Sequence, residues 1–582
     1  MRNTKPRVVA AGVVVLALAA CGGAGGEEDT SPDVRLSGSA GGQAFDPDRA
    51  APAAPIDGAV PGGTVTALSY FDLGSMDPTE AYRTETVSIL SGLVTRSLTQ
   101  YVFEPTSGSM VLVPDIATDT GTPNEDFTEW SFTIRDGVRF EDGSEVTAED
   151  VAFGIKRSFD RAAFDEGATF SNDYFLDGDA YKGPYRSGTS YPGVVVEGNT
   201  LTLKMARPFP DMPYWGSFPA MGPIPERRSD PAGYGRHPLA TGPYKFAEYT
   251  PGKSLSLVQN DQWDPDTDPG RHQYPDGYEF SFEVPAKQID ATILGDSEAG
   301  QTTLSINAGM GSHHRKAQVL DRLTLGSGQC TYMALPDYRK ITDIRVRRAI
   351  GYAFPYLEDT RALEDILGHT VLPGSSILPP GFPGRQDYDV LEIEPGRTDA
   401  DKARALLQQA GFAPGEYELK FPYVTSDPVW VARKERLVKA LGAAGFKVTP
   451  FPTSTQEARF EVSADPNAPI NLRLNGWCSE WPSGGAWFPQ LFHSGEADNE
   501  AHFAEPAVDA EIERISRLPV TEQAGAWGAL DRVIMTDYYP VISTSYTGSA
   551  MLHGSRIGGM NADSVYSMPT WKDIFVRQSQ AP

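Results

Sequence analysis

Residues 417–452 contain a strand–helix–strand pattern that restricts the fold more than any other part of the chain. "YELKFPYV" favours a strand, "VWVARKERLVKALGAAG" favours a helix, and "FKVTPFP" favours a second strand. Units of this kind build parallel sheet with right-handed crossovers, because a tight turn cannot connect two parallel strands. The pattern therefore predicts a mixed α/β protein.

Periodic patterns predict further strands and helices. Trp130, Phe132 and Ile134 alternate as in a half-buried strand, and residues 147–150, "TAED", resemble a capping box at the start of a helix. Further strands are expected in residues 64–70 and 242–260, and in residues 193–205 as a hairpin that turns at Gly198-Asn199. Further helices are expected in residues 86–98, 343–354 and 398–411. A chain of 582 residues is too long for one core, so at least two lobes are expected.

The first 21 residues have the pattern of an export signal. Three basic residues precede an apolar run from Val8 to Ala20, which is too short to span a bilayer as a helix. Leu18-Ala19-Ala20-Cys21 resembles the bacterial lipobox, in which the cysteine becomes lipid-modified. We therefore expect residues 1–20 to be a lipoprotein signal peptide and Cys21 to anchor the chain on the outer side of the cell membrane. An ordinary secretory signal with a chance cysteine is the alternative.

Residues 21–60 are expected to be the lipidated cysteine followed by a disordered tether. The segment is rich in Gly, Ala, Pro, Asp and Ser, and it contains few large apolar residues. Such a composition buries too little surface to offset the entropy lost on ordering. After it, no stretch reaches the ~18 apolar residues of a transmembrane helix.

Charge and motifs exclude several classes of function. The net charge of −27 argues against nucleic-acid binding and against electrostatic docking on anionic lipid. Residues 264–270, "DPDTDPG", space three aspartates like a calcium loop, but Pro269 and Pro275 replace its glycine and glutamate, so a polar turn is favoured over a calcium site. No complete catalytic or metal-binding motif occurs, so we expect no catalytic residue, no metal and no cofactor. A secreted hydrolase with an unrecognised triad remains the alternative, since triads are assembled in space.

Several long stretches resemble the peptide/nickel-binding solute-binding lipoproteins of ABC importers. Residues 130–157, "WSFTIRDGVRFEDGSEVTAEDVAFGIKR", are similar to a long signature segment of that family. Residues 62–78, 241–265 and 343–354 resemble further family segments, although Phe354-Pro355 departs from the usual pattern. The likeness extends over roughly residues 62–578.

The resemblance implies a periplasmic-binding-protein-like clamp with two lobes, mixed sheets and an extra subdomain. Ligand lies between the lobes, which close around it before a membrane permease receives it. The expected partners are an oligopeptide and the ABC permease subunits, and the expected state is a monomer. Lobe I would comprise residues 61–103, 190–328 and 546–582, the subdomain residues 104–189, and lobe II residues 329–545.

The resemblance also implies a disulfide and a ligand contact. In the oligopeptide-binding branch, a cysteine in a "GWC" segment pairs with one in a "CTY" segment, which here are Cys478 and Cys330. Once Cys21 is lipidated, an even pair of cysteines is left in an oxidising compartment, with two free thiols as the alternative. The family's carboxylate two residues later receives the peptide α-ammonium, and Glu480 stands at that position with one methylene more than aspartate.

Other residues of the predicted ligand site follow from the same segment. Asn475, Gly476, Trp477 and Cys478 would line the site, with the main chain of Gly476 and Trp477 pairing with an extended peptide. An arginine that the family often places four residues before the cysteine is absent, since Leu474 stands there with Arg473 adjacent. The aromatic candidates, for which core packing is an equal alternative, are Tyr70, Phe71, Trp481 and Trp487.

The sequence leaves the ligand open among several classes. A nickel chelate and an oligosaccharide are the alternatives to an oligopeptide within the same family. A receptor that senses peptides for a signalling partner is a further alternative to an importer.

Overall fold

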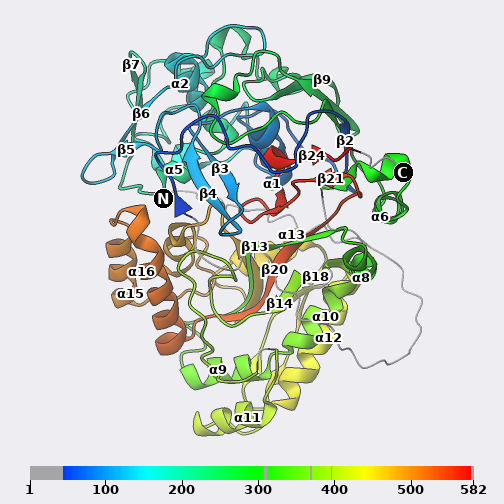
Figure 1. Cartoon of the computed structure of the whole chain (residues 1–582). Helices are drawn as coiled ribbons and strands as arrows, with labels where there is room; N and C mark the ends of the chain where they lie inside the picture. The colour runs from blue at the N-terminus through cyan, green and yellow to red at the C-terminus, as the bar shows by residue number, and fades with distance from the viewer. Residues whose placement is uncertain (1–43, 307–310, 368–369, 395, 579–582) are drawn as a thin grey trace.

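The computed structural model describes residues 44–306, 311–367, 370–394 and 396–578 (Figure 1). The predicted signal peptide and Cys21 lie outside these residues. Two large hydrophobic cores define two lobes. The core of lobe I is built mainly from residues 65–306 and 557–576, and the core of lobe II from residues 333–542. Figure 1 shows lobe I above lobe II, with the strands β13 and β20 at their junction.

Lobe I contains a five-stranded mixed sheet in the order β12-β2-β11-β10-β9. Its strands are Thr303–Ser305 (β12), Thr64–Leu68 (β2), Gly277–Ser281 (β11), Ser254–Gln259 (β10) and Tyr244–Thr250 (β9). Strand β2 pairs in parallel with β11 and β12, while β10 is antiparallel to both of its neighbours. The predicted strands in residues 64–70 and 242–260 are therefore confirmed.

A second sheet in lobe I has the order β5-β6-β8-β7. It comprises Thr122–Pro123 (β5), Glu129–Thr133 (β6), Thr200–Lys204 (β8) and Val194–Glu197 (β7), and the predicted hairpin turns at Gly198-Asn199. The helix α2 (Ala148–Arg157) starts with the predicted capping box, formed by Thr147 and Asp150. The expected subdomain boundary at residue 189 would separate β6 from its hydrogen-bonded neighbour β8, so we propose that the subdomain extends through Lys204.

Short elements complete lobe I, and one prediction there is only partly correct. The predicted helix 86–98 is α1 (Thr84–Ile89), continued by a π-helical turn at Leu90–Val94, after which the chain is extended and enters β3. The remaining helices of lobe I are α3 (Phe170–Tyr174), α4 (Pro184–Ser187), α5 (Met212–Trp215), α6 (Ala286–Leu294) and α7 (Glu298–Gln301). Two C-terminal strand pairs lie in the same lobe: β21 (Ile557–Gly558) with β24 (Phe575–Val576), and β22 (Ala562–Asp563) with β23 (Met568–Pro569).

Residues 44–60 are ordered on lobe I, so the prediction of a disordered tether is wrong for this part of the segment. Strand β1 (Ala44–Phe45) pairs in parallel with β4 (Ser109–Pro114), which is antiparallel to β3 (Thr99–Glu104). The Phe45 ring packs edge-on against Tyr214, and Arg49 forms an ion pair with Glu104 at 3.2 Å. A few specific contacts thus hold a segment whose overall composition favours disorder.

Two long strands connect lobe I to lobe II. β13 (Leu323–Pro336) and β20 (Ile542–Leu552) pair antiparallel, and their register shifts twice, between Ser327 and Cys330 and between Tyr332 and Met333. β14 (Val371–Pro373) and β19 (Leu472–Cys478) complete this sheet in the order β14-β20-β13-β19. The register shifts coincide with the boundary near residue 329 that the resemblance implied.

The predicted strand–helix–strand unit is confirmed in lobe II. The helix α12 (Pro428–Ala443), capped by Asp427, connects β15 (Glu418–Leu419) and β16 (Pro422–Val424) to β17 (Lys447–Val448) and β18 (Phe451–Thr453). Both strand pairs are parallel. The other helices of lobe II are α9 (Ile344–Ala353), α10 (Tyr356–Leu367), α11 (Ala400–Gln409), α13 (Gln456–Ala464), α14 (Phe488–Phe492), α15 (Pro506–Ile515) and α16 (Val520–Val533), and α8 (Gly311–Val319) precedes β13.

The aspartate-rich turn at residues 264–270 has a structural role in lobe I. Asp264 caps a short 3₁₀ turn, and Asp268 is buried in an ion-pair network with Arg96 and Arg271. Asp115 bridges the same two arginines at 2.7 and 2.8 Å. The favoured interpretation of this stretch as a polar turn is therefore confirmed.

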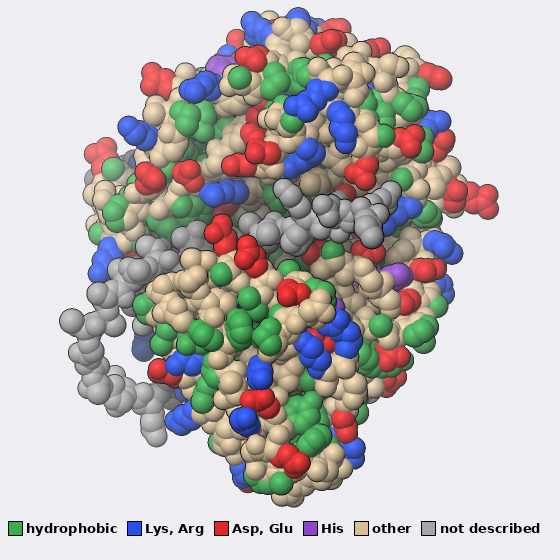
Figure 2. All heavy atoms as spheres, turned by 180° about the vertical axis from the view of Figure 1, so that it is seen from behind, with side chains coloured by type: hydrophobic (Ala, Val, Ile, Leu, Met, Phe, Trp, Pro, Cys, Tyr) green, Lys and Arg blue, Asp and Glu red, His purple; other side chains and the backbone are tan. Residues whose placement is uncertain are grey.

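The molecular surface is mixed in charge. On the face shown in Figure 2, acidic and basic side chains are interspersed over both lobes. Within the described ranges, every helix is too short or too polar to cross a membrane.

Candidate functional site

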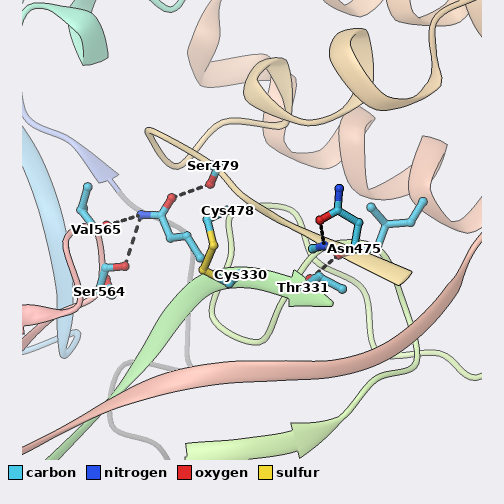
Figure 3. Close-up of a disulfide and its surroundings, with 10 residues drawn as sticks. Cys330, Thr331, Asn475, Cys478, Ser479, Ser564 and Val565 are labelled. Atoms are coloured by element: carbon cyan, nitrogen blue, oxygen red, sulfur yellow. Dashed lines mark hydrogen bonds between the residues drawn. A yellow bond between two sulfur atoms is a disulfide. The ribbon is translucent and has the colours of Figure 1, made fainter. Parts of the chain in front are cut away.

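The predicted site segment follows β19, which is an edge strand of the sheet at the lobe junction. β19 is antiparallel to β13, and Cys478 lies opposite Cys330, with the Cα atoms 4.1 Å apart. The two cysteines form the disulfide that the resemblance implied (Figure 3). The crosslink joins the site segment to a strand that connects the lobes.

Gln329 ties the same region to the C-terminal part of lobe I. Its Nε2 donates to the carbonyl oxygens of Ser564 and Val565 at 3.2 and 3.3 Å, and its Oε1 accepts from Ser479 Oγ at 2.7 Å (Figure 3). The Ser479 N–H donates to the Gln329 carbonyl oxygen at 3.2 Å. The residue that follows β19 is therefore linked to lobe I through the side chain of Gln329.

Glu480 contacts lobe I through its carboxylate. Its Oε1 accepts a hydrogen bond from the hydroxyl of Tyr82 at 3.3 Å. Its Oε2 is buried and has no hydrogen-bond partner in the part of the chain that the structure describes. An unpaired buried acceptor is costly, so this oxygen is suited to a cationic or hydrogen-bond-donating ligand.

The surroundings of Glu480 favour the neutral carboxyl group. Burial raises its pKa to about 7, and the charge of Asp498 acts in the same direction, against the hydrogen bond from Tyr82. A ligand ammonium beside Glu480 would lower this pKa again, because an opposite charge favours the ionised form. Binding of a cationic ligand at Glu480 would therefore be coupled to the ionisation of its carboxyl group.

Trp481 lies in the core of lobe I although β19 belongs to the sheet of lobe II. Its ring packs edge-on against Phe170 at 5.0 Å and also contacts Phe209 and Phe218. Its Nε1 donates to Asp211 Oδ2 at 2.8 Å. Trp481 was a candidate for the aromatic wall of a ligand site, but its ring is 1% exposed and joins the two lobes instead.

The start of the site segment lies beside a second buried acid. Asn475 Nδ2 donates to Glu500 Oε1 at 3.2 Å, and Glu500 Oε2 is buried without a partner among the described residues. Gly476 faces the ring of Tyr332, and a Cβ at this glycine would approach that ring to 2.8 Å. The segment therefore needs glycine to lie close to β13.

The side chains of Trp477, Trp487 and Arg473 are buried in contacts within lobe II, and for Trp477 the prediction concerned its main chain. Trp477 is buried, and its Nε1 donates to the Ala486 carbonyl oxygen at 2.8 Å. Trp487 is fully buried in the core of lobe II, so core packing accounts for it. Arg473 is fully buried and forms an ion pair with Asp337 at 3.2 Å, which leaves no arginine of β19 for a ligand.

Tyr70 and Phe71 are half-buried residues that follow β2. Their rings pack edge-on at 4.8 Å, and Tyr70 packs against a small third core where β2, α6 and β20 meet. Burial raises the pKa of Tyr70, with a contribution from the charge of Glu85. The structure thus places both residues in lobe I, in contacts separate from the Glu480 segment.

Comparison with known proteins identifies the family. The family described as "Bacterial extracellular solute-binding proteins, family 5 Middle" matches residues 111–499. The chain belongs to this family. Among curated relatives of this family 5 solute-binding protein is "Periplasmic oligopeptide-binding protein OppA" of Salmonella typhimurium, which is 22% identical over 403 residues, covering 66% of this chain and 70% of the relative.

Solved structures share the fold of this family 5 protein. "Clavulanic acid biosynthesis oligopeptide binding protein 2" has a TM-score of 0.79 and 22% identity, covering 93% of this chain and all of the other. The "MppA Periplasmic Murein Tripeptide Binding Protein, Unliganded Open Form" has a TM-score of 0.71 and 18% identity, covering 90% of this chain and 99% of the other. The predicted fold class, a mixed α/β binding-protein clamp, is confirmed.

Sequence reasoning about this family 5 protein missed the lobe I side of the site. Tyr82, Asp211 and Ser483 all contact or belong to the Glu480 segment, and none was predicted. Asp211 carries a recognisable signal, since it is a lone acid in the apolar and aromatic stretch "PFPDMPYW". Tyr82 and Glu500 carry none, because only the tertiary fold brings them to β19.

Proposed function

We propose that this family 5 solute-binding protein captures oligopeptides between its lobes and delivers them to the permease of an ABC importer, without chemistry of its own. The observation that carries the proposal is Glu480, a half-buried residue at the lobe junction whose carboxylate has one buried oxygen without a partner among the described residues. A peptide α-ammonium supplies both the charge and the N–H donors that this oxygen lacks.

The rest of the ligand would bind along the edge strand β19. An edge strand presents main-chain N–H and C=O groups that can pair with an added extended peptide. Main-chain recognition tolerates varied side chains, which suits a receptor for mixed peptides. The names of the relatives OppA, oligopeptide binding protein 2 and MppA support peptides over a nickel chelate or an oligosaccharide.

The cellular setting is part of the same proposal. Cleavage before Cys21 and lipidation of its thiol would anchor a monomeric receptor on the outer side of the membrane, beside its permease. Two acyl chains on one cysteine provide the stable anchoring that a single chain does not. Radiolabelled palmitate incorporation, abolished by Cys21→Ser, tests this part separately.

Native mass spectrometry of the mature protein, purified without refolding, tests the ligand. Release and fragmentation should yield a ladder of mixed peptides. Calorimetry should then show that N-acetylation of a bound peptide, or Glu480→Gln, weakens binding by tenfold or more. A single non-peptide mass or a metal complex would contradict the peptide assignment, and turnover of a bound peptide would favour a hydrolase.

A further inference from the structure

Asp211 is a buried lobe I carboxylate whose hydrogen-bonding partners come from beyond β19. Its Oδ2 accepts from Trp481 Nε1 at 2.8 Å, and its Oδ1 accepts from Ser483 Oγ at 3.0 Å. Asp211 directly precedes α5, yet its side chain makes no capping hydrogen bond to that helix. Both carboxylate oxygens are therefore committed to the segment that carries Glu480.

The fit around this carboxylate is close. A Cβ at Gly485 would lie 2.5 Å from Asp211 Oδ2, so any larger residue there would displace the Asp211 carboxylate. The same Ser483 hydroxyl that donates to Asp211 accepts from the Gly485 N–H at 3.1 Å, which shapes the turn. Ser483 is thus held by its own turn in the position from which its hydroxyl donates to Asp211.

Asp211 forms no ion pair with a basic side chain of the described residues. Within the described residues, no Lys or Arg nitrogen lies within 4 Å of its carboxylate. The charge of Asp211 adds to burial in raising the pKa of Tyr174 and Tyr214. Arg207 lies over the ring of Tyr174 at 4.9 Å, on the exposed side. The two hydrogen-bond donors from the Glu480 segment are therefore the groups that compensate the buried carboxylate.

We propose that Asp211 is the lobe I positioning residue that captures the Trp481–Ser483 segment on lobe closure and thereby fixes Glu480 for the ligand. The Trp481 ring packs among the rings of Phe170, Phe209 and Phe218. Asp211 accepts hydrogen bonds from Trp481 Nε1 and from Ser483 Oγ. Glu480, the residue before Trp481, is then held where its carboxylate accepts the hydrogen bond from the Tyr82 hydroxyl. The ligand part of this proposal rests on the proposed function, whereas the closure part stands without it.

The proposal has a pH signature. Burial raises the pKa of Asp211 to about 6, against the two hydrogen bonds, and separation of the lobes would return it toward its ordinary value. Closure then takes up a proton, so lowering the pH favours the closed form. The closed-to-open ratio should change about tenfold between pH 7.5 and pH 5.

Distance measurement between labels at Thr189→Cys and Lys439→Cys tests the closure part. Both sites are exposed, one on each lobe, and Cys21→Ser leaves the disulfide as the only other cysteine pair. The ligand-free chain is measured with Glu480→Gln as the common background, which removes the titration of Glu480. In that background the closed-to-open ratio should rise about tenfold when the pH is lowered from 7.5 to 5.

Variants at Asp211 give the decisive comparison. Asp211→Asn keeps an acceptor for Trp481 and should close equally at both pH values, while Asp211→Ala should close less at both. Asp563→Asn is the matched control, because Asp563 is a buried lobe I acid with a pKa raised to about 6 whose hydrogen bonds come from its own lobe. A tenfold pH response that survives in Asp211→Asn, or unchanged closure in Asp211→Ala, would overturn the proposal.

Peptide affinity separates this inference from the proposed function. With Glu480 intact, Asp211→Ala should weaken binding of a peptide found in the mass-spectrometric experiment by tenfold or more, and Asp211→Asn should largely restore it. Unchanged affinity in Asp211→Ala would overturn the positioning role. If no peptide binds the unmodified chain, the proposed function fails, and the closure measurement still decides the role of Asp211.

Discussion

Cys330 and Cys478 lie directly opposite each other on the antiparallel strands β13 and β19. One of these strands connects the lobes, and the other leads into the segment that holds Glu480. The disulfide therefore fixes the register at the point where the segment that carries Glu480 leaves the sheet.

Replacement of both cysteines, Cys330→Ser with Cys478→Ser, should destabilise the protein by about 2–5 kcal/mol, because the crosslink joins residues 148 apart in sequence and restricts the unfolded chain. Urea unfolding monitored by circular dichroism measures the change. Cys21→Ser is the control and should leave the transition in place. A double variant as stable as the parent would show that the β13–β19 pairing needs no crosslink.

Glu480→Gln should stabilise the ligand-free protein at pH 8 and leave its stability nearly unchanged at pH 4.5. The folded-state pKa of about 7 lies above the ordinary value of 4.5, so ionisation above that value opposes the folded, closed form. Allowing for partial exposure, the gain at pH 8 should be about 1–2 kcal/mol. Thermal unfolding at the two pH values measures it, and equal melting temperatures of parent and variant at pH 8 would count against a desolvated Glu480.

Peptide affinity should fall as the pH drops below about 7, because protonated Glu480 cannot pair with an ammonium group. Calorimetry between pH 5.5 and 8 in the Asp211→Asn chain measures this effect free of the opposite contribution from lobe closure. With Glu480→Gln added, the affinity should be low and flat over the same range. A peptide affinity that does not change with pH while Glu480 is intact would show that Glu480 does not bind the ammonium group.

Asp115→Asn should destabilise lobe I by about 3–5 kcal/mol, since the buried Arg96 and Arg271 would lose the carboxylate that bridges them. Denaturant unfolding of the ligand-free chain measures the loss. Glu511→Gln is the control, because its ion pair with Arg514 lies on the surface of α15 and should matter little. Equal effects of the two substitutions would contradict a structural role for the network.

Trp487→Ala should destabilise lobe II by about 3–5 kcal/mol, because Trp487 is fully buried against Phe382. Peptide affinity measured well below the unfolding temperature should remain close to that of the parent chain. A selective loss of affinity with unchanged stability would restore Trp487 as a ligand contact.

Local patterns predicted the regular elements well where the physical signal is local. The capping box of Thr147 and Asp150, the hairpin turn at Gly198-Asn199 and the parallel pairs flanking α12 all depend on residues close in sequence. The helix predicted to reach residue 98 ended at Val94, since Arg96 is drawn into a buried ion pair with Asp115. Long-range partners of this kind override local propensity.

Only the side of the candidate site formed by β13, β19 and the segment after β19 was predictable from the sequence. The resemblance led to Cys330 and Cys478, which pair across one sheet, and to Glu480, two residues beyond the end of that sheet. Tyr82 and Asp211 reach the segment from distant parts of the chain, 398 and 270 residues from their partners. Trp481 looked like a cleft wall because aromatic composition alone cannot distinguish a ligand contact from a contact between lobes.

The order of residues 44–60 has a mechanical consequence. β1, Arg49 and the Ala53 N–H, which donates to the Asp268 carbonyl oxygen, fasten this segment to lobe I. A force applied through the chain before residue 44 would therefore act first on lobe I. If Cys21 is lipidated as proposed, lobe I is the lobe held at the membrane and closure would move lobe II toward it, so the position of lobe II would tell the permease whether the receptor holds a ligand.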